Sequence, residues 1–493
     1  QSDSKLEELL EKEFKNENIE NLKSILNDPN NNNIILNIIN KQDNDGDYLL
    51  LRATIMNNIE IVKLLIDYAI EKNITLKINE KNNDGEYPLL WATTKNNIEI
   101  VKLLIDYANK YDIVLKINEQ NKWGNYPLLQ ATDKDNIEIV KLLVDYSIEK
   151  NIPLEINEKN KMQNYPLFWA TYRDNIEIVK LLIDYANKSN ITLKINEQNY
   201  NGNYPLLLAI YKNNIEIVKL LIDYANKNSI VLKINEQSDD EDYPLFWATY
   251  KNNIEIIKLL IDYSNKNNII LKINEQNNDG NYPLLIATDK DNIEMVKLLI
   301  DYAIEKNITL EINEQNQMKN YPLFWATYRD NIEIVKLLID YANKSNITLK
   351  INEQNYNGNY PLLLAIYKDN IEIVKLLIDY ANKNNITLEI NAQNNDEDYP
   401  LFWTTYRDNI EIVKLLIDYA NKSNITLKIN EQNYNGNYPL LLAIYRDNVE
   451  IVKLLIDYAN KNSIVLKINE QNNDREYPLH WATEMNNIEI LNY

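Results

Sequence analysis

Two hydrophobic patterns alternate along the chain, and residues 165–203 contain both. Between residues 176 and 188, apolar side chains cover most helical positions, and a single polar stripe runs through them. The stripe recurs at helical spacing and consists of Glu177, Lys180, Asp184 and Lys188. This pattern predicts a helix that must be covered on two or three sides. Apolar and polar residues then alternate with a period of two over residues 191–196, which predicts a short extended segment.

Residues with strong turn and capping preferences divide this pattern into elements. Pro166 stands where a helix can begin, because the first helical turn has no use for its missing N–H. The short helix it starts is expected to run to about Arg173. Asp174 and Asn175 then allow a left-handed turn and cap the next helix. After the extended segment, Gly202 can take a positive φ. The predicted unit is therefore helix, turn, helix, extended segment and turn.

This unit recurs at a constant interval of 39 residues. The tripeptide Tyr-Pro-Leu begins at positions 87, 126, 165, 204, 243, 282, 321, 360, 399, 438 and 477. Tyr48-Leu49-Leu50 continues the series backwards, which makes twelve copies, the last of them incomplete. Because one copy cannot cover its own second helix, neighbouring copies must stack. We expect residues 48–493 to form a tandem array and residues 1–47, a divergent acidic copy, to cap its exposed end.

The repeat resembles the ankyrin repeat. Residues 477–482 read Tyr-Pro-Leu-His-Trp-Ala and come near to that family's Thr-Pro-Leu-His-x-Ala signature. The stretches "EIVKLLID" and "NEQNNDGNYPL" are similar to the family's second helix and to its hairpin-to-helix junction. The resemblance implies an all-α repeat solenoid. Its ankyrin-type helix-turn-helix repeats would be joined by short extended hairpin and turn segments, and it would act as a protein-interaction scaffold.

The chain departs from the family pattern at positions that connect neighbouring repeats. Tyrosine replaces threonine at the start of the motif, and leucine or phenylalanine replaces histidine in every copy except at His480, for which we expect a structural role. We therefore expect apolar and aromatic packing to replace the hydrogen bonds that those residues usually supply. Tryptophan recurs in every second copy, and we expect it to pack in the core between paired repeats. The series is Trp91, Trp169, Trp247, Trp325, Trp403 and Trp481.

Composition and charge narrow the range of functions. The chain has 493 residues, a formal net charge of −21, no cysteine and one histidine. The charge argues against nucleic acid or an anionic membrane as a partner, and no apolar run is long enough for membrane insertion. Without cysteine and with one histidine, thiol chemistry and a Ser-His-Asp arrangement are excluded. We therefore expect no enzyme activity, no catalytic residue and no cofactor.

The cellular location is less constrained. A chain without cysteine works in either redox setting, and no signal-peptide pattern precedes Gln1. The chain does not begin with methionine, which indicates a processed form or a fragment. We favour a cytoplasmic location and keep secretion as the alternative.

Two acidic loop segments raise the question of calcium binding. Residues 238–242 read Ser-Asp-Asp-Glu-Asp, and residues 394–398 read Asn-Asn-Asp-Glu-Asp. Carboxylates are the ligands that calcium prefers, but the alternating ligand spacing of an EF-hand loop is absent. We therefore expect charged loop tips and no metal site.

Differences between the near-identical copies indicate a binding surface. They concentrate at the end of the first helix and at the turn tip. The ankyrin resemblance implies that both regions line the concave groove that contacts partner proteins. The candidate residues at the helix ends are Tyr172, Arg173, Tyr211, Lys212, Tyr250, Lys251, Tyr328, Arg329, Tyr367, Lys368, Tyr406, Arg407, Tyr445 and Arg446. The candidates at the tips are Trp123, Tyr200, Tyr356 and Tyr434. Tyrosine and arginine are enriched at interface hot spots; the alternative is that these side chains only cover their neighbours along the stack.

Two further functions stay open. The last copy stops partway through its second helix without a polar cap, which would allow end-to-end self-association. Asn-x-Ser/Thr acceptors follow the second helices and would be N-glycosylation sites in a secreted binder whose aromatic groove meets carbohydrate. In an asparagine-rich chain, chance is the alternative explanation. The acceptors are Asn73, Asn187, Asn190, Asn307, Asn343, Asn346, Asn385, Asn421 and Asn424.

Overall fold

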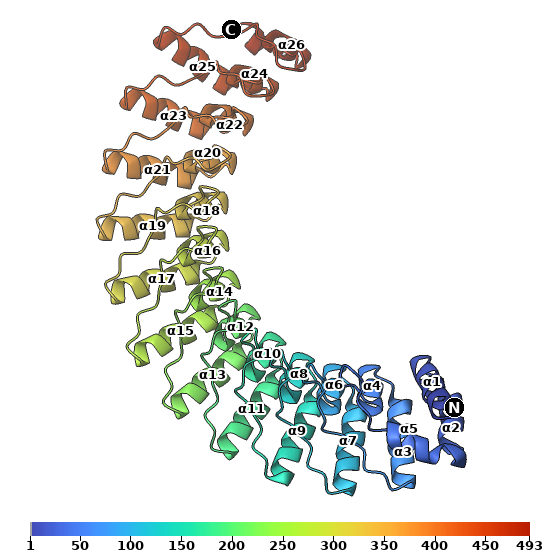
Figure 1. Cartoon of the computed structure of the whole chain (residues 1–493). Helices are drawn as coiled ribbons and strands as arrows, with labels where there is room; N and C mark the ends of the chain where they lie inside the picture. Colours follow the sequence, from blue (N-terminus) through green and yellow to red (C-terminus); the bar gives the residue numbers. More distant parts are fainter. Residues whose placement is uncertain (1) are drawn as a thin grey trace. The chain divides into compact units, whose positions relative to one another are not determined.

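The computed structural model describes residues 2–493, in which 27 α-helices and no strand occur (Figure 1). The chain divides into two compact units, Gln1–Asp239 and Asp240–Tyr493. After the leading helices, short first helices alternate with longer second helices. The leading elements are α1 (Ser2–Lys15), α2 (Ile19–Asn27), η1 (Pro29–Asn31) and α3 (Asn32–Ile38).

The twelve predicted copies correspond to twelve helix pairs. The first helices are α4 (Leu49–Ile55), α6 (Pro88–Thr94), α8 (Pro127–Asp133), α10 (Pro166–Tyr172), α12 (Pro205–Tyr211), α14 (Pro244–Tyr250), α16 (Pro283–Asp289), α18 (Pro322–Tyr328), α20 (Pro361–Tyr367), α22 (Pro400–Tyr406), α24 (Pro439–Tyr445) and α26 (Pro478–Glu484). The second helices are α5 (Ile59–Glu71), α7 (Ile98–Lys110), α9 (Ile137–Lys150), α11 (Ile176–Lys188), α13 (Ile215–Lys227), α15 (Ile254–Lys266), α17 (Ile293–Glu305), α19 (Ile332–Lys344), α21 (Ile371–Lys383), α23 (Ile410–Lys422), α25 (Val449–Lys461) and α27 (Ile488–Leu491).

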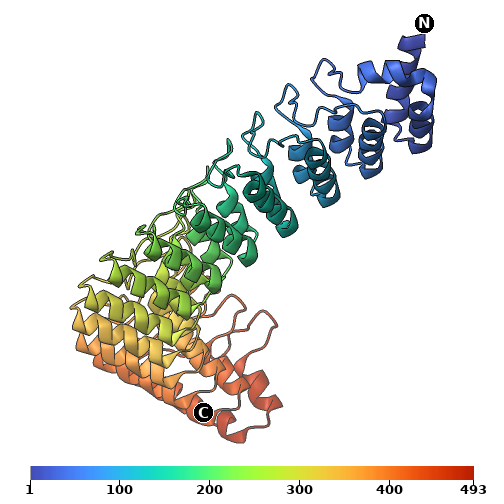
Figure 2. The same cartoon turned by 90° about the horizontal axis from the view of Figure 1, so that it is seen from below.

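Within each unit the first helices form one row and the second helices another (Figure 1). In the first unit, for example, α8 packs against α6 and α10, while α11 packs against α9 and α13. Figure 2 shows that the segments joining one pair to the next project from the same side of the helices in this unit. The predicted all-α stack of helix-turn-helix repeats is therefore confirmed.

The turn between the two helices of a pair follows the predicted chemistry. Pro166 is the first residue of α10, and Asp174 takes the left-handed conformation with φ of 62°. Asn175 caps α11, because its side-chain oxygen accepts a hydrogen bond from the Ile178 N–H at 3.0 Å. Its Nδ2 also donates to Asp135 Oδ1 of the preceding repeat at 2.7 Å. The cap therefore fixes both the start of a helix and its register with the neighbouring pair.

The extended segments are held by asparagine side chains. Leu193 and Ile195 are buried, as the period-two pattern predicts, while Lys194 is exposed. Asn157, in the preceding repeat, donates through Nδ2 to the Thr192 carbonyl at 2.9 Å. It also accepts the Lys194 N–H at 2.9 Å through Oδ1. One side chain thus makes the two hydrogen bonds that a paired strand would make, so neighbouring segments are joined without a β-ladder.

The prediction that apolar packing replaces hydrogen bonds between repeats is wrong. Tyr165, the first residue of the motif, is fully buried, and its hydroxyl donates to the Glu197 carbonyl at 2.7 Å. Tyr185 of the second helix accepts the Leu154 N–H of the preceding repeat at 2.7 Å. A buried hydroxyl is costly unless it is hydrogen-bonded, and these partners satisfy it. Tyrosine therefore supplies both the apolar ring and the hydrogen bond.

The leading helices lie next to the first helix pair. Arg52 of α4 forms an ion pair with Glu11 of α1 at 2.7 Å, and its guanidinium lies 4.9 Å from the Phe14 ring centroid. Helix α2 packs against α5, as a preceding second helix would. The division into residues 1–47 and 48–493, and the capping role of the former, stay predictions.

Candidate functional site

Seven first helices end in a tyrosine that is exposed on the surface of the stack. Tyr172 is representative, with 41% of its surface accessible. We use the name aromatic face for these seven tyrosines together with the tryptophan that lies three residues earlier in alternate repeats. The tyrosines are Tyr172, Tyr211, Tyr250, Tyr328, Tyr367, Tyr406 and Tyr445. A cationic residue, such as Arg173, follows each of them at the C-cap of the helix.

The tryptophan series does not lie in the core as predicted. All six tryptophans of the series are half-buried, whereas the residue at the same position in the intervening repeats, such as Leu208, is buried. Trp169 and Tyr172 stand one helical turn apart and therefore share a face. Their ring centroids are 5.5 Å apart in an edge-to-face arrangement. The prediction failed because it read tryptophan as an apolar residue only, while its large amphipathic ring suits a half-exposed position.

In the first unit, cations connect neighbouring repeats of the aromatic face. The Lys212 ammonium lies 5.0 Å from the centroid of the Tyr172 ring in the preceding repeat. The Arg173 guanidinium lies 5.5 Å from the Trp169 ring and 5.7 Å from the Tyr172 ring. Each exposed cation–π contact is worth about 0.5–1 kcal/mol. The side chains are thereby held in place before any partner arrives, which reduces the entropy lost on binding.

In the second unit, rings and cations continue from repeat to repeat. Tyr367 meets Trp403 of the following repeat edge-to-face, with centroids 4.8 Å apart. The Arg407 guanidinium lies 5.0 Å from the Tyr367 ring. Tyr445 and Trp481 repeat the same edge-to-face contact at 4.7 Å. The side chains of the aromatic face therefore do cover their neighbours, and they also stay accessible to solvent.

An ion pair lies beside the aromatic face in the first unit. Arg173 Nη2 lies 2.7 Å from Asp133 Oδ1, and Arg173 remains 40% exposed. A shallow surface hollow of about 550 Å³ lies here, lined by Asp133, Lys134, Asp135, Tyr172, Arg173 and Lys212. The hollow is open and polar, which suits a contacting polypeptide better than an enclosed small molecule.

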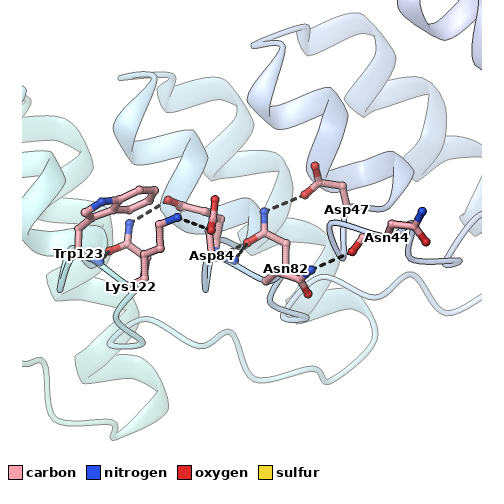
Figure 3. Close-up of polar contacts among 9 residues, drawn as sticks. Asn44, Asp47, Asn82, Asp84, Lys122 and Trp123 are labelled. Atoms are coloured by element: carbon pink, nitrogen blue, oxygen red, sulfur yellow. Dashed lines mark hydrogen bonds and ion pairs between the residues drawn. The ribbon is translucent and has the colours of Figure 1, made fainter.

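The turn tips form a second row of exposed side chains. Tyr200 is 70% exposed, and Trp123, Tyr356 and Tyr434 are exposed as well. Backbone hydrogen bonds join successive tips: the Tyr200 N–H donates to the Met162 carbonyl at 3.1 Å. Figure 3 shows the first tips of this row, where the Lys122 ammonium lies 4.4 Å from the Trp123 ring centroid and 2.5 Å from Asp84 Oδ1. The tip candidates therefore lie on an ordered backbone.

The last residue of each acidic loop segment accepts a hydrogen bond from the following repeat. Asp242 accepts a hydrogen bond from Asn277 Nδ2 at 3.3 Å, and Asp398 accepts one from Asn433 Nδ2 at 2.8 Å. Burial raises the pKa of both carboxyl groups, and the hydrogen bond lowers the pKa in part. Over residues 2–493, no group of three or more histidine, aspartate or glutamate side chains is arranged to hold a metal ion.

The remaining candidates lie on the surface. Six of the nine Asn-x-Ser/Thr acceptors are exposed in left-handed turns after the second helices: Asn73, Asn190, Asn307, Asn346, Asn385 and Asn424. Their glycosylation stays a prediction. His480 is exposed, and its Nε2 lies 3.3 Å from Glu484 Oε2. In the part of the chain that the structure describes, no helix is both long enough and apolar enough to cross a bilayer.

Sequence reasoning missed the asparagine side chains that connect repeats. Asn199 illustrates them: its Oδ1 accepts the Asn201 and Asn203 N–H groups, and its Nδ2 donates to Asn164 Oδ1 of the preceding tip at 3.1 Å. Three asparagines per repeat, represented by Asn157, Asn175 and Asn199, make bonds of this kind. The available signal was that asparagine recurs at fixed positions of the repeat.

Comparison with protein families supports the same architecture. The description "Ankyrin repeats (3 copies)" matches residues 13–116, 70–154, 112–195, 152–231, 228–310, 309–389, 383–464 and 424–493. No curated protein matches the chain in a sequence search. Because the family matches extend over nearly all of the sequence and the helix pairs recur with the same period, the chain belongs to the ankyrin-repeat family.

Proposed function

We propose that the chain is a non-enzymatic scaffold that binds partner proteins through the aromatic face. Ankyrin repeats are in general protein-interaction modules. The observation that carries the proposal is the accessibility of tyrosines that ring and cation contacts already hold in place, such as Tyr172 and Tyr367. Tyrosine, tryptophan and arginine supply large contact areas at interface hot spots. The exposed tips at Trp123 and Tyr200 would extend this surface.

Photo-crosslinking tests where partners bind. A photoreactive phenylalanine analogue is introduced at Tyr172, Tyr328 or Tyr406, and matched variants carry it at Glu177 or Asp184 on the exposed stripe of the second helix. Crosslinked proteins are then identified in extracts of cells that make the protein. We expect the same partner from the three aromatic-face positions and none from the two stripe positions. Crosslinks that come from the stripe alone would reject the proposed surface.

Alanine substitution measures what the two rows of side chains contribute. In one variant Tyr172, Tyr328 and Tyr406 become alanine, and in a matched variant the tip residues Tyr200, Tyr356 and Tyr434 do. Removal of one hot-spot side chain costs about 2 kcal/mol or more, so we expect the first variant to lose the partner that the crosslinks identify. Loss in the second variant alone would assign binding to the tips.

End-to-end self-association is a second candidate function, favoured by an apolar surface at α24–α26. Leu479 is 55% exposed, whereas Leu440, at the same position one repeat earlier, is buried by the following pair. A hollow of about 360 Å³ lies here, lined in part by Leu440, Ile468, Leu479 and Leu491. Sedimentation velocity over a concentration series should then show oligomers that Leu479→Glu removes. A single monomeric species at every concentration would reject this function.

A further inference from the structure

The arrangement around Arg173 occurs a second time, four repeats further along the chain. We define the first cluster as Asp133, Trp169, Tyr172, Arg173 and Lys212, and the second cluster as Asp289, Trp325, Tyr328, Arg329 and Lys368. The first cluster lies within the unit Gln1–Asp239 and the second within Asp240–Tyr493. Each unit therefore carries its own complete set of five side chains.

The two clusters agree in their geometry. Arg329 Nη2 lies 2.7 Å from Asp289 Oδ1, the same distance as between Arg173 and Asp133. The Arg329 guanidinium lies 5.6 Å from the Trp325 ring and 5.8 Å from the Tyr328 ring. In the first cluster the corresponding distances are 5.5 Å and 5.7 Å.

The lysine of the following repeat takes the same place in both clusters. Lys368 lies 5.2 Å from the Tyr328 ring, and Lys212 lies 5.0 Å from the Tyr172 ring. Tyr172 and Tyr328 have equal exposure. The likeness thus extends to the contacts and accessibility of the side chains.

The likeness continues at the tips of the same repeats. Met162 and Met318 are exposed at the tips that precede Trp169 and Trp325, and Tyr200 and Tyr356 are exposed at the next tips. In both places the tyrosine N–H donates to the methionine carbonyl, at 3.1 Å and 3.0 Å. A partner that reads both the cluster and the tips would therefore meet the same side chains twice.

A third first helix that ends in Tyr-Arg lacks the arrangement of the two clusters. The arrangement therefore depends on the preceding repeat as well as on the Tyr-Arg pair. In the repeat before Tyr406 and Arg407, the first helix ends in Tyr367. Both clusters have aspartate at the corresponding position. Arg407 consequently lies against the Tyr367 ring at 5.0 Å. The aspartate clamp on arginine is thus a property of the two clusters and distinguishes them from this neighbouring part of the aromatic face.

The charges of each cluster define the chemistry of its ligand. Arginine is balanced by its aspartate, while Lys212 and Lys368 contact tyrosine rings and, among residues 2–493, no carboxylate. Each cluster therefore offers a half-exposed aromatic ring beside one ammonium group that lacks an acidic partner. A peptide segment with an aromatic or apolar side chain next to a carboxylate matches both features.

We propose that the chain has two equivalent sites and binds two copies of one acidic, aromatic peptide segment, one at each cluster. This inference rests on the proposed function. The sites differ in some neighbours. Lys290 lies 4.6 Å from the Tyr250 ring, whereas Thr94 holds the corresponding position before Lys134, and Asn213 follows Lys212 where Asp369 follows Lys368. The affinities of the two sites should therefore be similar and need not be identical.

The test uses a defined peptide as the probe. A random peptide library displayed on phage is selected on the whole chain, the enriched peptide is synthesised, and its binding stoichiometry is measured by titration calorimetry. We expect two peptides per chain and an enriched sequence that joins an aromatic residue to aspartate or glutamate. Tyr172→Ala and Tyr328→Ala should each remove one site, with affinity at the altered site reduced about 30-fold or more. The double variant should remove both sites.

The controls separate this inference from the proposed function. Ile148→Ala alters an exposed apolar side chain of the second helix α9, outside the aromatic face and both clusters, and should leave two sites; circular dichroism confirms that each variant is folded. Lys212→Met together with Lys368→Met should weaken binding at both sites while the stoichiometry stays at two. One peptide per chain, abolished by one of the two tyrosine variants, would overturn the duplication and leave the proposed function standing. If every selected peptide still binds the double variant, both this inference and the proposed function would be overturned.

Discussion

Two buried tyrosines of one repeat should differ in what their hydroxyl groups contribute to stability. The Tyr321 hydroxyl donates to the Glu353 carbonyl at 2.8 Å, while the Tyr341 hydroxyl accepts the Leu310 N–H at 2.8 Å. Both tyrosine rings are buried. Replacing either tyrosine by phenylalanine keeps the ring and removes one hydrogen bond. The pair of variants therefore isolates the hydrogen bond from the packing.

The expected costs differ because the two backbone groups differ in their access to water. Glu353 is exposed, so water can replace the hydroxyl at its carbonyl, and Tyr321→Phe should lower the free energy of unfolding by about 0.5–1.5 kcal/mol. Leu310 is buried, and its N–H would be left without an acceptor. An unsatisfied buried donor costs about 1–3 kcal/mol. Tyr341→Phe should therefore be the more destabilising of the two.

Urea unfolding followed by circular dichroism measures both costs, and hydrogen exchange localises them. The peptide 305–318 contains Leu310 and occurs once in the sequence, so mass spectrometry can follow it. Its exchange should accelerate more in Tyr341→Phe than in Tyr321→Phe. Tyr356→Phe alters an exposed ring and should change neither measurement. Equal costs, a reversed order or unchanged exchange of this peptide would refute the reasoning.

Three further predictions concern the contacts between repeats. Burial raises the pKa of Asp398, so the native state keeps this proton to higher pH than the unfolded chain and loses stability as the pH rises from the unfolded pKa to the folded one. The free energy of unfolding in urea should therefore be higher for Asp398→Asn than for the wild type at pH 7 and equal at pH 3. A lower value for the variant at pH 7 would contradict this. The Lys336–Glu372 ion pair (2.6 Å) is half-exposed, so Lys336→Met should cost less than about 1 kcal/mol in 0.1 M salt and nothing in 1 M salt. Gly358 has φ of +75°, and an added Cβ would lie 2.8 Å from Asn394 Cα, so Gly358→Ala should lower the free energy of unfolding by about 1–2 kcal/mol. Lys319 occupies the equivalent position of the preceding repeat with φ of 59°, so Lys319→Gly should raise the free energy of unfolding. The opposite sign for either variant would refute the strain argument.

The elements were predictable from the sequence because their determinants are local. Pro166 at the start of α10, the left-handed Asp174 and the capping Asn175 act within a few residues of each other, and the structure confirms each. The fixed interval between copies then predicts the number of helix pairs. Long-range partners were less accessible, because the hydroxyl of Tyr165 bonds a carbonyl 32 residues away. The preference for tyrosine over phenylalanine, 35 residues against 5, was the signal for that bond.

The candidate site was predictable only in part. The variable ends of the first helices did identify exposed tyrosines and cations, although their role in binding stays a proposal. The tryptophans were misplaced because hydrophobicity alone assigns a large ring to the core. Spacing alone would not have placed them either, because Leu208 stands three residues before the exposed Tyr211 and is buried. The size and the polar N–H of the tryptophan ring therefore account for its half-exposed position on such short helices.

The hydrogen bonds between repeats also explain where the copies are free to differ. Asn157, Asn175 and Tyr185 each bond a group in a neighbouring repeat, so a change at these positions breaks a contact in another repeat as well. The exposed end of the first helix contacts the next repeat through side chains that vary between copies: aspartate at position 133 and tyrosine at position 367 occupy the same place in the repeat. That single difference decides whether the next arginine is clamped by a carboxylate or lies on a ring. An almost uniform stack can therefore present different recognition chemistry from one repeat to the next without altering the contacts that hold it together.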